Sequence, residues 1–315
     1  MSLATENSAL LPGTVDSAYL AGPREFVSLM KPRVMSLVVL TALAGMLIAP
    51  GSLNPIVGFA ALTAIAIGAG ASGALNMWWD ADIDARMART RLRAVPSGLI
   101  KPKEALGFGL TLAFLSVLTL AAVTNPLAAT LLAFTIFYYV VIYTMWLKRL
   151  TPQNIVIGGA AGALPPMVGC AAASGGLTID SLWLFAIIFM WTPPHFWALA
   201  LVKARDYERV GVPMMPNVKG PAHTRLEILI YSLLLAPLGL IPWFTGAGGL
   251  LYGLAALVLG AGFCVHAGRV YLHRDGAEAN KRAMGLFGYS IFYLFALFGL
   301  LVVEHGFGLI ARWGL

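Results

Sequence analysis

The sequence predicts an all-α membrane protein in which nine transmembrane helices form one bundle. Three observations lead to this prediction: the composition, the spacing of charge-free intervals and the placement of basic residues. The chain of 315 residues is 59% hydrophobic and only 11% charged, with a mean hydropathy of +0.82. Soluble chains carry roughly 25% charged residues. Cys170 and Cys264 stand alone in apolar segments, so they indicate neither a disulfide framework nor a metal site.

The charge-free intervals give the expected helices in order. A spanning helix needs about 20 apolar residues, so 34–79, 105–147, 150–202 and 228–268 each accommodate two helices, and 283–303 accommodates one. Of these intervals, only 150–202 contains a charged residue, Asp180. Turn signals stand near the middle of each long interval, at 50–55, 125–126, 174–178 and 246–249. Strands of a membrane barrel would instead alternate apolar and polar residues over about ten positions.

The basic residues indicate the orientation. Every Lys and Arg except Arg312 lies before the first expected helix or in the loop after an even-numbered one. The positive-inside rule then places the N-terminus and these loops in the cytoplasm and the C-terminus in the periplasm, in a bacterial inner membrane. The positive-inside rule therefore explains the net charge of +7, which does not indicate nucleic-acid binding. We expect 1–30 to be a cytoplasmic N-terminal segment, without a signal peptide. We expect 31–315 to be one nine-helix domain with a central or lateral substrate chamber and cytoplasmic site loops.

The end of the second expected helix carries an unusual acidic cluster, Asn76-Met-Trp-Trp-Asp80-Ala-Asp82-Ile-Asp84. Asn76, Asp80 and Asp84 are four residues apart, so they lie along one helix face with about 6 Å of rise per step. Such hard oxygen ligands suit Mg²⁺, which takes one or two carboxylates together with water and substrate phosphate. Asp82 falls on another face. The alternative is a solvated helix end, but intramembrane polar groups are costly and usually functional.

Basic residues in three same-side loops accompany this cluster. Cations beside a metal site indicate a larger anionic ligand, for which a diphosphate is the natural candidate. The positive-inside rule alone would also place basic residues here, and this alternative stays open for each of them. The residues are Arg89, Arg93, Lys148, Lys203 and Arg205.

His195 lies in the sixth expected helix, within Pro193-Pro-His-Phe-Trp197. The two prolines are expected to kink that helix and to free backbone carbonyls. A single membrane histidine is as often a hydrogen-bonded core residue as a ligand. Tyr143 and Asn154, which flank the third basic loop, are either interface anchors or residues that line a site.

The acidic cluster resembles the first aspartate-rich motif of the UbiA superfamily of intramembrane prenyltransferases. Within that superfamily, the stretches 87–93, 143–158, 162–166, 193–200 and 206–214 are similar to those of protohaem IX farnesyltransferases, the haem O synthases. Together they extend over most of the chain from Lys31 to about Gly220. The second superfamily motif is usually D-x-x-x-D, whereas here Val210 stands four residues after Asp206.

The resemblance implies farnesyl transfer from farnesyl diphosphate to a vinyl group of haem B, giving haem O. It implies Mg²⁺ held by Asn76, Asp80 and Asp84, with Asp206 facing them. Implied partners are the lipid bilayer, haem A synthase and haem-copper oxidase assembly factors. The alternatives are a quinone-precursor prenyltransferase, a secondary transporter and a structural subunit of an oxidase. The implied diphosphate-binding residues are Arg93, Lys148, Lys203 and Arg205, and the implied haem-binding residues are His195, Arg89 and Tyr143.

Overall fold

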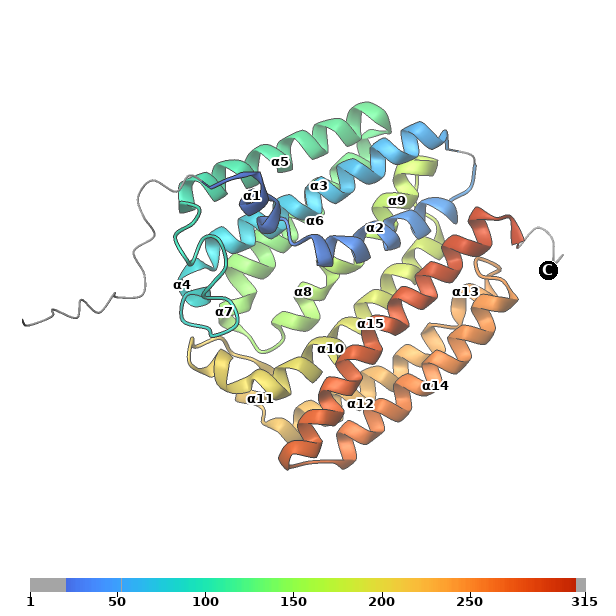
Figure 1. The fold of residues 1–315 in the computed structure, drawn as a ribbon. Helices are drawn as coiled ribbons and strands as arrows, with labels where there is room; N and C mark the ends of the chain where they lie inside the picture. The colour runs from blue at the N-terminus through green and yellow to red at the C-terminus, as the bar shows by residue number, and fades with distance from the viewer. Residues whose placement is uncertain (1–20, 52, 310–315) are drawn as a thin grey trace, which may run out of the picture.

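The computed structural model describes residues 21–51 and 53–309, and all regular structure in these ranges is helical (Figure 1). Residues 1–20 of the expected N-terminal segment and Arg312 lie outside the described residues. One element, η1, is a π-helix. The elements are α1 Pro23–Leu29, α2 Pro32–Leu47, α3 Pro55–Trp79, α4 Ala81–Asp84, α5 Pro102–Val123, α6 Pro126–Phe137, η1 Tyr138–Leu147, α7 Lys148–Leu150, α8 Asn154–Ala163, α9 Pro165–Ser174, α10 Ile179–Glu208, α11 Met215–Val218, α12 Pro221–Leu238, α13 Ile241–Phe244, α14 Leu250–Leu272 and α15 Gly276–Gly306.

Eight of the expected nine spans are confirmed by length and composition. Within the described ranges, eight helical segments are long and apolar enough to cross a membrane. Three of these eight combine consecutive elements, at Pro126–Leu150, Asn154–Ser174 and Pro221–Phe244. The pair α1 and α2, whose axes differ by 56°, passes the same test when taken together and would make the ninth. All four predicted turns fall between spans.

The connections alternate between the two ends of the bundle (Figure 1). The segments α4, α7 and α11 lie at one end, whereas α13 and the last turns of α9 and α15 lie at the other. The basic loops therefore gather at one end, as the charge pattern predicted. Which end faces the cytoplasm stays a prediction.

Small residues allow the helices that surround the site to approach closely. A Cβ atom on Gly45 of α2 would lie 2.0 Å from the carbonyl oxygen of Pro166 on α9. A Cβ atom on Gly169 of α9 would lie equally close, 2.0 Å, to the carbonyl oxygen of Ala42. Only glycine fits at both positions. Such small-residue contacts are how helices associate in lipid, where the hydrophobic effect does not distinguish one helix from its surroundings.

Helix α2 joins two hydrophobic clusters. One cluster is formed largely by α8, α10, α12, α14 and α15, and it includes Ala44. The other is formed largely by α3, α5, α6 and α9, and it includes Ala42 and Met46. Because α2 contributes to both, it links the half of the bundle that carries the acidic cluster to the half that carries α10.

The residue of α10 with non-helical backbone angles is not one of its prolines, and the kink expected at the prolines stays a prediction. Pro193 and Pro194 lie in the helical part of α10 that precedes Lys203. The non-helical backbone within α10 is at Lys203, with φ −107° and ψ 15°. The Thr192 hydroxyl donates to the carbonyl oxygen of Ile188 at 2.8 Å, as side chains near a membrane proline commonly do.

Candidate active site

The row of Asn76, Asp80 and Asp84 is buried at the end of α3 and in α4. The three residues are 5%, 1% and 3% exposed. Their backbone keeps the helical spacing, since the amide of Asp80 donates to Asn76 O and that of Asp84 donates to Asp80 O. The amide nitrogen Nδ2 of Asn76 donates to Asp80 Oδ2 at 2.8 Å. The predicted row along one face is therefore present.

Three cations from three different elements contact this row. Lys148 Nζ lies 2.5 Å from Asp80 Oδ2, and Arg93 donates to Asp84 Oδ2 at 2.6 Å. Lys31 Nζ donates to Asn76 Oδ1 at 2.6 Å. Charge-assisted bonds of this kind are about twice as strong as neutral ones. They offset part of the cost of burying two carboxylates.

Local backbone irregularities place two of these cations. The π-helix η1 precedes Lys148 and presents Thr144, whose hydroxyl accepts from Asn76 Nδ2 at 3.1 Å. π-helical turns within α-helices are frequent at functional sites. Lys31 has φ +54° and is the only non-glycine residue with a positive φ in the described ranges. This left-handed conformation costs about 1–2 kcal/mol, and it lies at the bend between α1 and α2.

Asp82 points away from the row, as its position predicted. Its carboxylate accepts two bonds from Arg149, at 2.9 and 2.7 Å, and its side chain is 54% exposed. The hydrogen bond from Arg149 lowers the pKa of Asp82 below its ordinary value. Asp82 and Arg149 therefore form a surface ion pair beside the row rather than part of it.

One oxygen of the row has no hydrogen-bond partner. Asp80 Oδ1 is buried and unsatisfied, and Arg149 approaches it only to 3.8 Å. A buried carboxylate oxygen without a donor is costly unless a ligand completes it. Since the row offers only hard oxygen atoms, its donor set fits Mg²⁺.

Lys203, Arg205 and Asp206 lie apart from the row. They line a cleft at the end of α10 together with Arg209 and Asn280. Asp206 is within 3.9 Å of Arg209, and its side chain is 21% exposed. The described part of the chain contains no group of three or more His, Cys, Asp or Glu that could hold a metal, so Asp206 is not brought together with Asp80 and Asp84. Val210 is buried in the hydrophobic cluster of α10.

The three residues assigned to haem by resemblance occupy different surroundings. His195 is 8% exposed on α10 and bonds Ser290 of α15, with 2.7 Å between Nδ1 and Oγ. The Tyr143 ring packs on α8, where a Cβ atom at Gly158 would lie 2.1 Å from it. Arg89 is exposed in the loop after α4. Within the described residues, no ring contact or hydrogen bond joins any two of these three.

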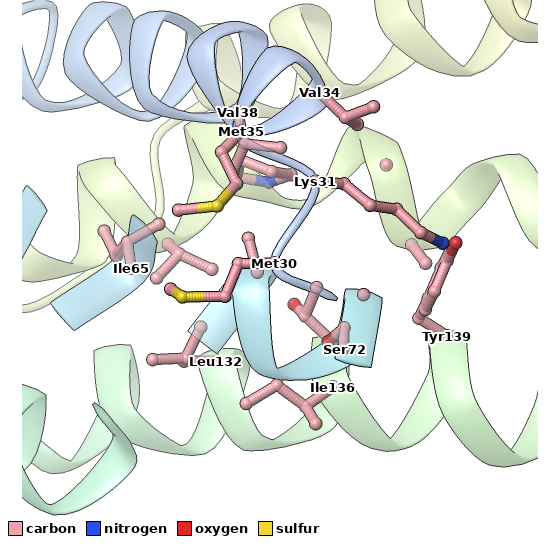
Figure 2. Close-up of a pocket in the computed structure, with 17 residues that line it drawn as sticks. Met30, Lys31, Val34, Met35, Val38, Ile65, Ser72, Leu132, Ile136 and Tyr139 are labelled. Atoms are coloured by element: carbon pink, nitrogen blue, oxygen red, sulfur yellow. The ribbon is translucent and has the colours of Figure 1, made fainter. Parts of the chain in front are cut away.

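An apolar cavity begins beside the row. It encloses about 730 Å³ of empty space, its open mouth included. Figure 2 shows the side chains of Lys31 and Tyr139 reaching toward one edge, while Met30 and Leu132 line the interior. Because Lys31 both lines the cavity and bonds Asn76, the cavity and the acidic row share a boundary.

The sequence analysis missed two residues that complete the site. Lys31 and Thr144, which bond Asn76, were not predicted as site residues. For Lys31 a signal existed, because it is a charged residue directly before the proline that begins an apolar run. For Thr144 there was none, since a single threonine in an apolar helix is ordinary.

Comparison with known proteins places this arrangement in a family. Residues 38–303 match the UbiA prenyltransferase family. The chain belongs to the UbiA prenyltransferase family. Curated relatives named Protoheme IX farnesyltransferase include that of Beijerinckia indica, 65% identical over 285 residues, which cover 90% of this chain and 89% of the relative. That of Methylocella silvestris is 62% identical over 286 residues, which cover 91% and 90%.

Solved structures share the UbiA fold at low identity. A digeranylgeranylglyceryl phosphate synthase matches with a TM-score of 0.72 at 15% identity, over 89% of this chain and 98% of that one. A UbiA homologue from Archaeoglobus fulgidus, bound to GPP and Mg²⁺, matches with a TM-score of 0.64 at 16% identity, over 88% and 99%. These similarities confirm the all-helical membrane fold that the sequence predicted.

Proposed function

We propose that this UbiA-family member transfers the farnesyl group of farnesyl diphosphate to a vinyl group of haem B. The observation that carries the proposal is the buried row Asn76, Asp80 and Asp84, surrounded by cations and adjoining an apolar cavity. A site of this kind suits a ligand with an anionic head and an apolar tail. The relatives named Protoheme IX farnesyltransferase support the choice of donor and acceptor.

The reaction breaks the bond between the allylic carbon of the farnesyl group and the diphosphate oxygen. The terminal vinyl carbon of haem B then forms a bond to the allylic carbon, which leaves a cation on the carbon next to the porphyrin ring. Water adds to that carbon and loses a proton. The products are haem O, with its hydroxyethylfarnesyl group, and diphosphate.

Asn76, Asp80 and Asp84 would hold Mg²⁺, and we assign Asp206 to the same task once the end of α10 closes on the bound metal and diphosphate. The unpartnered Asp80 Oδ1 supports this assignment, as does the Mg²⁺ bound in the Archaeoglobus homologue. When bound, Mg²⁺ supplies positive charge that stabilises the departing diphosphate.

The basic residues would take up the remaining charge of the diphosphate. We assign Arg93, Lys148, Lys203 and Arg205 to it, and add Lys31 because of its bond to Asn76. Arg93 and Lys148 pair with the acidic row in this structure. Binding of metal and diphosphate would let them exchange a carboxylate for a phosphate oxygen. Cations fixed in advance stabilise the charge that develops as the bond breaks.

The apolar cavity would keep the allylic cation from water until the vinyl carbon reacts. His195, Arg89 and Tyr143 would bind haem B as the acceptor. We place the protein in the bacterial inner membrane, with its basic end cytoplasmic. Haem O would pass to haem A synthase or to haem-copper oxidase assembly factors.

The deciding experiment uses the purified full chain in detergent with haem B, farnesyl diphosphate and Mg²⁺. We expect a product with the mass of haem O, and we expect chelation of Mg²⁺ to abolish it. An aromatic quinone precursor in place of haem is the matched alternative acceptor. Prenylation of that acceptor without haem O formation would overturn the proposal.

A further inference from the structure

His195 is held in a fixed plane between two aromatic rings from different helices. Its ring stacks on Trp191 of α10 with centroids 4.2 Å apart and on Phe287 of α15 with centroids 4.6 Å apart. The interplanar angles are 16° and 20°. Two stacking partners leave the imidazole little freedom to rotate about its Cβ–Cγ bond, so the plane in which its two nitrogens lie is set.

Ser290 determines which nitrogen of that ring carries the proton. Its hydroxyl donates to the carbonyl oxygen of Phe287 at 2.7 Å. A serine hydroxyl has one proton, so the same oxygen must accept in its 2.7 Å contact with His195 Nδ1. Nδ1 is therefore the protonated nitrogen, and Nε2 carries a lone pair.

The surroundings favour a neutral ring. His195 is 8% exposed, and it takes part in none of the ion pairs found between described residues. A buried cation without a counter-ion is costly, so the imidazole stays uncharged. Nε2 makes no hydrogen bond with the described part of the chain, which leaves its lone pair free for a ligand.

Ser290 also fixes the ring above His195. The indole nitrogen of Trp191 donates to the Ser290 carbonyl oxygen at 2.7 Å. Through its side chain and its backbone, one residue of α15 thus orients two aromatic side chains of α10. This connection is independent of the stacking contacts and joins the two helices at the same level.

We propose that Ser290 is a positioning residue that keeps His195 as the Nδ1–H tautomer and thereby presents Nε2 as an axial ligand to the iron of the haem substrate. The inference rests on the proposed function, since it takes haem B as the acceptor. Histidine ligands of metals regularly donate their second ring N–H to an oxygen, which fixes the tautomer and raises the basicity of the ligand. A proximal histidine is a common haem ligand.

The test titrates haem B into the full chain and into four variants, with binding followed by absorption and the iron–histidine bond by resonance Raman. Ser290→Ala removes the acceptor. Ser232→Ala is the matched control, because Ser232 is equally buried and its hydroxyl donates to Ile228 O at 2.6 Å in the same manner. His195→Asn keeps a donor near the Nδ1 position but has no atom in place of Nε2.

We expect Ser290→Ala to raise the Kd for haem B about 10-fold and to weaken the iron–histidine band, as loss of an outer partner typically costs 10- to 100-fold in metal affinity. Ser232→Ala should match the unmodified chain, and His195→Asn should lose the band. Ser290→Thr keeps a hydroxyl, so it should restore the band even if the alanine variant folds poorly.

Two results would overturn the inference: a Ser290→Ala variant that matches Ser232→Ala in Kd and band, or a band that persists in His195→Asn. The mass assay for haem O separates these results from the fate of the proposed function. If haem O forms while either result holds, only the role of Ser290 is lost. If no haem O forms from the unmodified chain, the proposed function fails first.

Discussion

Asp80 on α3 and Asp206 on α10 carry the same functional group at the same end of the bundle, but their surroundings differ. The side chain of Asp80 is 1% exposed and bonds Lys148 at 2.5 Å. That of Asp206 is 21% exposed, and its ion pair with Arg209 is long, at 3.9 Å. The first carboxylate is held by a dense network, whereas the second faces an open cleft.

This difference shows which half of the site is organised before substrate arrives. Around Asp80, cations from three elements already balance the buried charge, and only Oδ1 lacks a partner. Around Asp206, the non-helical backbone at Lys203 leaves the end of α10 out of line with the rest of that helix. We therefore expect the α3 side to fix the position of metal and diphosphate, and the α10 side to close on them.

The largest effect should follow from Asp80→Asn. This change keeps the shape of the side chain but removes the charge that would hold Mg²⁺, so haem O formation at saturating Mg²⁺ should fall on the order of 10³-fold. Asp82→Asn is the control, because Asp82 lies off the row and pairs with Arg149. Its turnover should stay within about threefold of normal. Similar losses in both variants would contradict the assignment of Asp80 to the acidic row and of Asp82 to a surface ion pair.

A second, smaller effect is expected for Lys148→Met. Loss of this cation should lower kcat/KM for farnesyl diphosphate by 10- to 100-fold, about 1.4–2.8 kcal/mol of transition-state stabilisation. It should also destabilise the fold by roughly 3–5 kcal/mol, because Asp80 would remain buried without its partner. Mass assay and thermal unfolding in detergent measure the two effects.

The double variant Asp80→Asn with Lys148→Met separates stability from catalysis. It removes both charges, so the unfolding temperature should recover while haem O formation should not. Recovery of both would show that the pair matters only for folding.

The acidic row and two cations near it, Arg93 and Lys148, could be predicted, but Lys31 and the contacts that these cations make with the row could not. Asn76, Asp80 and Asp84 are related by helix periodicity, which sequence spacing alone determines. Lys31 and Lys148 meet them across 45 and 68 residues of chain, through a left-handed residue and a π-helix. Those irregularities depend on how neighbouring helices pack. Local sequence pattern contains no information on that packing.

The spans themselves were predictable for a related reason. Lipid requires every backbone group to bond within its own segment, so hydrophobic length alone indicates a helix. The kink expected at Pro193 stays a prediction, whereas the break of α10 at Lys203 was not predicted from the sequence. Ser290 was not predicted because nothing in the sequence links α15 to His195.

A third prediction concerns the open half of the site. Asp206→Asn should lower haem O formation about 10-fold and raise the Mg²⁺ concentration needed for half-maximal rate. The effect should be weaker than for Asp80 because Val210 leaves that side with fewer ligands. Glu208→Gln, an exposed neighbour on the same helix, is the control and should leave the Mg²⁺ requirement unchanged. An Asp206→Asn variant as inactive as Asp80→Asn would show that both halves hold the metal equally.

The smallest effect belongs to the surface pair of Asp82 and Arg149, and it depends on pH. The hydrogen bond from Arg149 lowers the pKa of Asp82 in the folded state below its ordinary value of 3.8. Its stabilisation is therefore fully present above about pH 3.8 and is lost as pH falls through the lower folded value. Because the Asp82 side chain is 54% exposed, the contribution at neutral pH should stay below about 1 kcal/mol.

The measurement compares thermal unfolding of Asp82→Asn with that of the unmodified chain at pH 7 and at pH below 3. The variant should unfold slightly earlier at neutral pH, and the two curves should converge in acid, where the native carboxylate is protonated as well. A difference that persists in acid would mean that Asp82 stabilises α4 through packing rather than charge. In that case the ion pair with Arg149 would not explain why Asp82 lies off the acidic row.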